Sequence, residues 1–279
     1  MPENQKVFLK TKDYLVTQEA FDLVHDADTG LLITYPVPQD LQAYYNSNDY
    51  ISHTDNRKGL LPFLYQTVKK IMLRQKYHLI RRLQSNTSSL LDIGAGTGDF
   101  LQYMKSKNWS VQGLEPNQQA RKLAAQKHIH LFESFKTLDS TSVSVITMWH
   151  VLEHVPNLPQ TLSLIHNHLN SQGHLIIAVP NYNSLDARYY KGHWAAYDTP
   201  RHLWHFNKHT ITRLVTEHGF QHIRTKPMLF DSFYVSLLSE KYKKTIIPYL
   251  PAFIIGILSN FCGLFTKEYS SHIYIFQKV

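Results

Sequence analysis

The stretch Leu90-Leu91-Asp92-Ile93-Gly94-Ala95-Gly96-Thr97-Gly98-Asp99-Phe100 decides the fold. An apolar run typical of a buried strand leads into a turn with three glycines, and a helical pattern begins at Asp99. Glycines let the backbone approach a ligand without interference from a Cβ atom, and the free N–H groups of the helix start face the same place. The stretch therefore predicts a strand, a ligand-binding loop and a helix.

The spacing of the glycines bears on the ligand. A dinucleotide loop has its third glycine three residues after the second, whereas here the order is Gly94-x-Gly96-x-Gly98 and Asp99 takes that place. Acidic residues on both sides, Asp92 and Asp99, oppose a phosphate. They favour a cationic, phosphate-free ligand such as S-adenosylmethionine over NAD.

A second acidic signal follows one strand later, in Gly113-Leu114-Glu115-Pro116. A carboxylate at this place can accept hydrogen bonds from both hydroxyls of a ribose. The competing interpretation is a solvated acid at a helix start. Its position after the glycine loop favours ribose binding by Glu115.

Outward from these motifs, strand-length apolar runs alternate with segments of helical spacing. This alternation predicts an α/β fold with a mostly parallel, doubly wound sheet. The expected strands are 89–93, 110–114, 129–132, 142–149, 173–179, 220–225 and 271–278, and the expected helices are 62–83, 99–108, 117–127, 158–169 and 207–218.

Two further motifs follow along the chain, Met148 to Val155 and Gly173 to Asn181. The four motifs in this order resemble the class I S-adenosylmethionine-dependent methyltransferases, in particular the bacterial group that includes ubiquinone-biosynthesis O-methyltransferases. The resemblance implies a Rossmann-like sheet of seven strands and S-adenosyl-L-methionine as cofactor. The cofactor-binding residues implied are Asp92, Gly94, Ala95, Gly96, Thr97, Gly98, Glu115, Trp149 and His150.

Two departures from the resembled group concern metals. Relatives often carry a Cys-x-x-Cys pair where this chain has Asp26 and Thr29, so no zinc knuckle is expected. Quinone O-methyltransferases carry Glu-x-x-Glu-His, proposed to hold a divalent metal, where this chain has His150-Val-Leu-Glu153-His154. We therefore assign no metal ligands from the sequence, although a site here stays an open alternative.

Histidines are the candidates for removing a proton from a methyl acceptor. The candidate bases are His150, His202 and His205; His154 and His150 have competing roles as a packing residue and as a wall of the cofactor pocket. In the run Tyr197-Asp-Thr-Pro-Arg201-His202-Leu-Trp204-His205, the expected substrate-binding residues are Arg201, Trp204 and Tyr197. Arg201 would bind an acidic group on the acceptor. The alternative is a loop held by its own aromatic rings.

The expected organisation is an N-terminal extension with a β-hairpin, residues 1–61, and a methyltransferase domain, residues 62–279. The latter divides into a cofactor-binding core at 88–181, a loop or lid at 182–206, and an apolar helical insertion at 228–267 before the last strand. Ile246 to Phe265 carries no charge and is long enough to cross a bilayer. A single crossing would separate the last strand from its sheet, so we expect a helical cover over the site, with peripheral membrane contact or a dimer surface as alternatives.

Composition and charge limit the function and the cellular location that we expect. The net charge of +8 comes from scattered basic pairs, so nucleic-acid binding is not expected. One cysteine, Cys262, and a polar N-terminus without an apolar signal core indicate a cytoplasmic protein. We expect an S-adenosylmethionine-dependent methyltransferase acting on a small-molecule or lipid-linked acceptor. The alternatives are a non-catalytic S-adenosylmethionine-binding protein and, less favoured, an NAD-dependent oxidoreductase.

Overall fold

The computed structural model describes residues 6–26, 29–45, 60–83, 88–138 and 142–279. Its centre is a six-stranded sheet in the order β5-β4-β6-β7-β10-β9. The strands are β4 (Ser89–Ile93), β5 (Ser110–Leu114), β6 (Val143–Trp149), β7 (Leu169–Pro180), β9 (Phe220–Pro227) and β10 (Ser271–Lys278). Strands β4 to β7 are parallel, and β10 is antiparallel to both of its neighbours.

The prediction of seven strands in this sheet is wrong by one. The expected strand 129–132 forms only an isolated parallel bridge between Phe132 and Leu114. Two backbone hydrogen bonds, from Phe132 to Gly113 and from Glu115 to Phe132, hold it beside β5. The segment is followed at once by a bend, so it is too short to continue the ladder.

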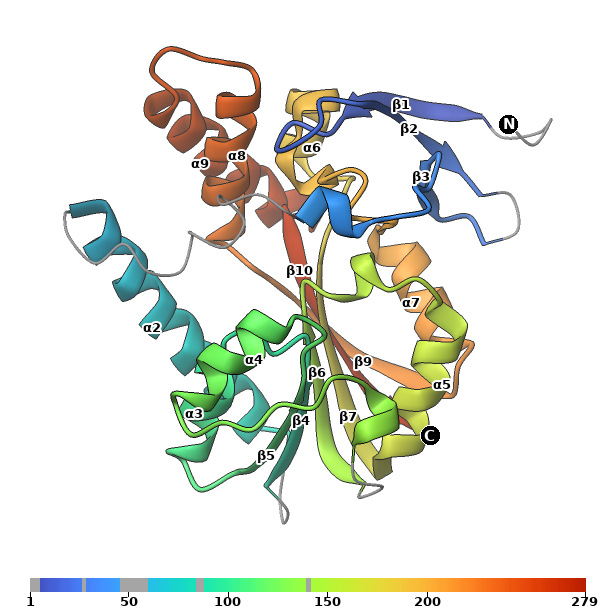
Figure 1. The fold of residues 1–279 in the computed structure, drawn as a ribbon. Coiled ribbons are helices and arrows are strands. Elements are labelled where there is room, and N and C mark those ends of the chain that lie inside the picture. The colour runs from blue at the N-terminus through green and yellow to red at the C-terminus, as the bar shows by residue number, and fades with distance from the viewer. Residues whose placement is uncertain (1–5, 27–28, 46–59, 84–87, 139–141) are drawn as a thin grey trace.

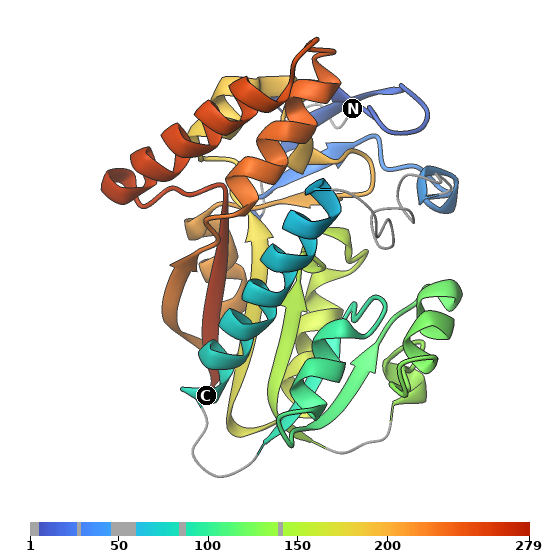
Figure 2. The same ribbon diagram turned by 90° about the vertical axis from the view of Figure 1, so that its left-hand side faces the viewer.

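Helices cover both faces of this sheet. On one face lie α2 (Leu60–Arg81), α3 (Asp99–Lys105) and α4 (Gln118–Ala125), and on the other lie α5 (Leu158–His168) and α7 (Lys208–Thr216). Figure 2 shows α2 crossing the face of the sheet. Each face has its own buried apolar cluster, which explains why the central strands are apolar on both sides.

A second layer lies beyond the carboxyl ends of the parallel strands (Figures 1 and 2). It contains a four-stranded antiparallel sheet in the order β1-β2-β3-β8, made of β1 (Val7–Lys12), β2 (Ala20–His25), β3 (Leu32–Tyr35) and β8 (Trp204–His205). Helices α6 (Leu185–Tyr190), α8 (Asp231–Tyr242) and α9 (Tyr249–Thr266) complete the layer. A third apolar cluster joins this sheet to the three helices.

The expected hairpin is confirmed as β2 and β3, paired from Asp22 with Tyr35 to His25 with Leu32. The expected loop 182–206 is more ordered than predicted, because it contains α6 and ends in β8. Strand β8 pairs with β3, so this segment is part of the N-terminal sheet. The expected boundary between residues 61 and 62 follows residues 46–59, which lie outside the described residues.

Among the described residues, one helix, α9, is long and apolar enough to cross a membrane by length and composition. Its C-terminal end connects directly to β10, which pairs with β7 on one side and β9 on the other. The chain thus returns after α9 to the main sheet, where β10 lies next to the edge strand β9, and the expected pairing of the last strand with this sheet is confirmed.

The imidazole of His272 on β10 makes the stability of this sheet sensitive to pH. The residue is 2% exposed, and burial lowers its pKa to about 4. Because the folded-state pKa lies below the unfolded value, the unfolded chain binds more protons between the two, and stability is lost as pH falls from about 6.5 to about 4. We expect this histidine to account for a loss of about 3 kcal/mol over that window.

Thermal unfolding measured from pH 7 to pH 4, with His272→Phe beside the wild type, checks this expectation. The variant should retain more of its stability in acid, because Phe cannot be protonated. Parallel pH profiles for the two proteins would contradict it.

Candidate functional site

The glycine turn after β4 is a strained backbone loop that only glycine adopts readily. Gly94, Gly96 and Gly98 have φ angles of 71°, 54° and 76°, in the left-handed region. A Cβ atom on Gly94 would lie 2.4 Å from Val151, whereas one on Gly96 would meet no protein atom within 4 Å. Gly94 is therefore required by packing, and Gly96 borders open space into which a ligand can fit.

The carboxylate of Glu115 closes this loop from the adjacent strand. Its two oxygens accept hydrogen bonds from the backbone N–H groups of Gly96, at 2.8 Å, and Asn117, at 2.9 Å. Gly94 and Ala95 both donate to the carbonyl oxygen of Leu114, which fixes the loop against the end of β5. Since a carboxylate has about four lone-pair sites, Glu115 keeps acceptor capacity for hydroxyl groups of a ligand.

Asp92 and Asp99 play different roles from those inferred from their charge. Asp92 is buried and accepts a hydrogen bond from Thr147 at 2.5 Å. Burial raises the pKa of Asp92 to about 7, although the bond from Thr147 opposes this rise. Asp99 forms ion pairs with Lys69, at 2.6 Å, and Lys127, at 2.9 Å, so its charge is balanced within the protein and does not by itself repel phosphate. Thr97 donates to Asp99 and accepts from Lys127.

Trp149, at the end of β6, has a cation on its ring face. The Nζ atom of Lys76 lies 4.0 Å from the centre of the indole ring, and Phe100 meets that ring edge-on. Burial lowers the pKa of Lys76 to about 8, opposed by the charges of Asp92 and Asp231. The ammonium group of Lys76, from the helix before the glycine loop, thus lies over Trp149 at the carboxyl end of β6.

His150 follows β6 and stands between two carboxylates. Its Nε2 atom is 3.0 Å from Asp231 and its Nδ1 atom is 3.4 Å from Glu153. Burial alone would lower the pKa of His150, but the hydrogen bond with Asp231 and the charge of Glu153 outweigh it and raise the pKa to about 10. Protonated at neutral pH, His150 cannot accept a proton from an acceptor, which argues against its role as a base.

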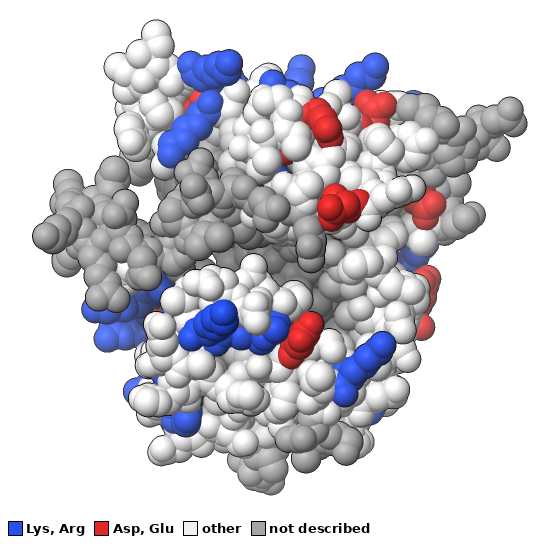
Figure 3. All heavy atoms as spheres, viewed as in Figure 1, with Lys and Arg blue, Asp and Glu red and all other residues white. Residues whose placement is uncertain are grey.

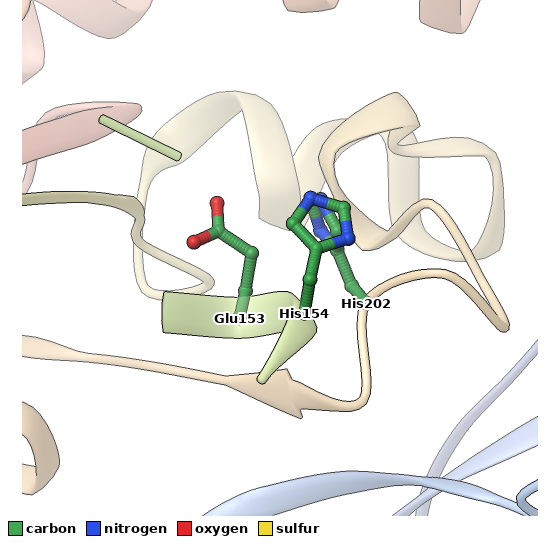
Figure 4. A group of neighbouring side chains, drawn as sticks. All are labelled: Glu153, His154 and His202. Atoms are coloured by element: carbon green, nitrogen blue, oxygen red, sulfur yellow. The ribbon is translucent and has the colours of Figure 1, made fainter. Parts of the chain in front are cut away.

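Glu153, His154 and His202 form a cluster whose ligand atoms all lie within 4.8 Å of one another (Figure 4). Glu153 is 1% exposed, and both of its carboxylate oxygens lack a hydrogen bond among the described residues. The Nδ1 atoms of His154 and His202 lie 3.0 Å and 2.9 Å from the carbonyl oxygens of Arg201 and Ala196. A carbonyl only accepts, so in the neutral rings Nδ1 carries the proton and Nε2 keeps its lone pair. These donors suit a divalent cation with imidazole and carboxylate ligands.

A cavity of about 370 Å³ adjoins this cluster, beyond the carboxyl ends of β6 and β7. Helix α8 contributes one wall, and the segment 195–202 contributes another. It is mostly apolar, and its lining residues are Leu15, His150, His154, Pro180, Ala195, Ala196, Asp198, His202, Asp231, Tyr234, Val235, Leu238, Tyr242 and Ser271. Its size and character suit a small organic ligand.

A methyltransferase-domain family model matches residues 65–225, which are more than half of the chain. The chain belongs to the methyltransferase-domain family. It therefore carries a methyltransferase domain that uses S-adenosylmethionine as the methyl donor. This finding does not support the alternative of an NAD-dependent oxidoreductase.

One curated relative and two solved structures show what this chain is similar to. An uncharacterized methyltransferase of Alkaliphilus oremlandii is 31% identical over 97 residues, which are 32% of this chain and 44% of that protein. The chain thus spans less than half the length of this curated relative. A methyltransferase of Archaeoglobus fulgidus shares the fold with a TM-score of 0.52 and 18% identity, covering 77% of this chain and 99% of the other. For a possible histamine N-methyltransferase of Thermotoga maritima the TM-score is 0.51 with 14% identity, covering 78% and 97%.

Three residues expected to act on substrate have other partners in this methyltransferase. Tyr197 is buried in the apolar cluster of the second layer, and Trp204 donates its indole N–H to the carbonyl oxygen of Val155. Neither lines the large cavity. His205 is 5% exposed with Nε2 2.9 Å from the hydroxyl of Thr34, and burial lowers its pKa to about 3. It does not line the large cavity, which argues against its role as a base for an acceptor held there.

Arg201 departs most clearly from its expected role in substrate binding. It is 1% exposed and bonds Asp13, Asp198 and the carbonyl oxygen of Tyr44 at 2.7 to 2.9 Å. These partners contradict a direct contact with an acidic acceptor. Arg201 instead fastens the segment before β8 to the N-terminal region.

Several residues of the site escaped the sequence analysis. Lys76 lies within the expected helix 62–83 and Asp231 within the expected insertion 228–267, and neither was named as a candidate. No local spacing connects either with the glycine loop. The only available signal was the position of 228–267 between the last two strands, which predicted a cover over the site but not which side chains line it.

We expect Glu115→Gln to weaken S-adenosylmethionine binding by about 1–3 kcal/mol, because it removes a charged acceptor. Isothermal titration calorimetry measures this as a roughly 5- to 150-fold rise in Kd. Glu133→Gln is the matched control, since that carboxylate is 67% exposed and pairs with Arg121 on the surface. Equal affinity in the wild type and Glu115→Gln would remove Glu115 from the cofactor site.

Proposed function

We propose that this protein transfers the methyl group of S-adenosylmethionine to a small, largely apolar or lipid-linked acceptor held in the 370 Å³ cavity. The observation that carries the proposal is the position of this cavity. It lies at the carboxyl ends of β6 and β7, where parallel sheets bind ligands, and the segments 182–206 and 228–267 both contribute to its walls. Such walls would keep water away from the sulfonium.

In the proposed reaction, a nucleophilic atom of the acceptor forms a bond to the methyl carbon as the bond from that carbon to sulfur breaks. The sulfur leaves with the electron pair as a thioether, and a hydroxyl acceptor must lose its proton. His202 is the proposed base, because its Nε2 lone pair is free of the bond to Ala196, and it lines the cavity. Burial and the neighbouring His154 lower its pKa well below the usual value, which keeps the ring neutral.

In the alternative arrangement, Glu153, His154 and His202 would hold a divalent cation, which would acidify an acceptor hydroxyl. The Nε2 atom of His202 would then be a ligand of the cation and not the base. The short distances between the three ligand atoms and the fixed histidine tautomers support this proposal. Glu153-His154 also matches the last two residues of the Glu-x-x-Glu-His motif of quinone O-methyltransferases, whereas His150 departs from its first residue. Membership of that narrower group and a hydroxylated, lipid-linked acceptor are therefore part of the proposal. So is a cytoplasmic location, supported by the single cysteine.

Formation of S-adenosylhomocysteine during incubation with fractionated small molecules and lipids tests this function. Product that depends on one fraction, and falls strongly in His202→Gln with cofactor affinity unchanged, is the expected result. Tight cofactor binding without product in any fraction would instead support a non-catalytic binding protein.

A further inference from the structure

Helix α9 buries small residues and exposes large apolar ones, which is unusual for a helix in contact with water. Its inward positions are mostly small: Ala252, Ile255, Gly256, Ser259 and Gly263 are the buried ones. Its outward positions are large and apolar: Leu250, Phe253, Ile254, Ile257, Leu258, Phe261, Leu264 and Phe265 are 45–73% exposed. A surface helix normally shows the opposite distribution.

The small inward residues explain how this arrangement is stable. A Cβ on Gly256 would lie 2.6 Å from the ring of Phe233 on α8, and one on Gly263 would lie 2.6 Å from the ring of Tyr269. Close packing on α8 thus uses the small face of α9 and leaves the large side chains outward. The connection before α9 extends the same surface, because Ile246 is 97% exposed and Ile247 is 68% exposed.

Basic residues lie at both ends of this apolar surface. Lys241, Lys243 and Lys244 precede it and Lys267 follows it, all exposed. The nearest acids are already partnered: Glu240 accepts from Thr245 and pairs with Lys243, and Glu268 pairs with Lys208. The upper left of Figure 3, where α8 and α9 lie in Figure 1, is mostly uncharged with lysine or arginine at its border.

We propose that α9 and residues 246–248 dock on the surface of a lipid bilayer that contains anionic lipids. The apolar face would enter the boundary between headgroups and acyl chains, and Lys241, Lys244 and Lys267 would meet the lipid phosphates. The helix lies along the surface, because β10 begins five residues after its end and belongs to the main sheet. A second copy is a poorer occupant, since two-fold pairing of α9 would bring lysines against lysines.

Helix α8, which packs against α9, also lines the cavity. Asp231, Tyr234 and Leu238 of α8 face it, while α8 packs against α9 on another side. Docking would hold the cavity beside the bilayer, and this consequence, which rests on the proposed function, fits a lipid-linked acceptor. Docking itself does not depend on methyl transfer.

Sedimentation with unilamellar vesicles tests the proposal. We expect the wild type to bind vesicles of equal parts phosphatidylcholine and phosphatidylglycerol more tightly than vesicles of phosphatidylcholine alone, with a difference that decreases in high salt. Phe253→Ser combined with Phe261→Ser should weaken binding about tenfold or more. Ile223→Ser, at a 42% exposed residue on β9, is the matched control and should bind like the wild type.

Thermal unfolding and S-adenosylmethionine affinity should be the same in the double variant as in the wild type, because both residues are exposed and outside the cavity. Lys241→Gln with Lys244→Gln should remove the preference for anionic vesicles. Failure of the wild type to bind either vesicle, or equal binding by the double variant, overturns the proposal. So does a lipid-free dimer, seen by light scattering, that the double variant abolishes. Loss of methyl transfer with vesicle binding intact would count against the proposed function alone.

Discussion

Gly96→Val is expected to produce a folded protein that no longer binds S-adenosylmethionine. A Cβ on Gly96 meets no protein atom within 4 Å, so a valine side chain would occupy the open side of the loop. The left-handed backbone there, with φ of 54°, adds a stability cost of about 1–2 kcal/mol. Affinity should fall by at least about 100-fold, which is close to 3 kcal/mol.

Calorimetry with S-adenosylmethionine measures this effect, and Gly30→Val is a matched control. Gly30 also has a left-handed φ, 68°, and open space at its Cβ, but it lies in the turn between β2 and β3. The control should lose similar stability and keep full affinity. If folded Gly96→Val bound the cofactor normally, our interpretation of the glycine loop would be wrong.

Arg201→Ala should destabilise the protein by about 3–5 kcal/mol, because it leaves buried carboxylates without their cation. Asp13 is fully buried, and its pKa is lowered by bonds to Thr17 and by Arg201 despite the opposing effect of burial. Differential scanning calorimetry should record a fall in Tm on the order of 6–15 °C.

The control is Arg213→Ala, where a 45% exposed side chain pairs with a 58% exposed Glu217. Its cost should stay below about 1 kcal/mol. A normal Tm in Arg201→Ala, with weakened use of an acidic acceptor, would restore the role in substrate binding that the sequence suggested.

Local pattern predicted most of the main sheet, because apolar runs and turns report the elements that they form themselves. The observed strands β4, β5, β6, β9 and β10 lie within two residues of the expected ranges. Pairing between segments far apart in the chain could not be predicted from the sequence. Strand β8 has two residues, and it is a strand only because β3 lies beside it.

The site also contains residues that local sequence predicts and residues whose environment depends on distant segments. The loop from Gly94 to Gly98 and Glu115 come together as predicted, since a strand end and a helix start place them. His205 and Arg201 look identical, in sequence, to solvent-facing catalytic residues. Their burial depends on Thr34 and Asp13, about 170 and 190 positions away, so only the folded chain distinguishes them.

The pairing of β3 with β8 imposes an order on biosynthesis. Strand β3 leaves the ribosome long before Trp204 and His205, its partners, have been made. At roughly 5–20 residues per second the interval is about 10–30 s, during which the first hairpin has one edge unpaired and Asp13 lacks its arginine. The N-terminal sheet can therefore be completed only after β8 has been synthesised. The demand for chaperones should therefore last until residue 205 has been synthesised. A chain truncated before residue 205 should leave the edge of β3 unpaired, so the boundary at residue 61 does not mark off an independent unit.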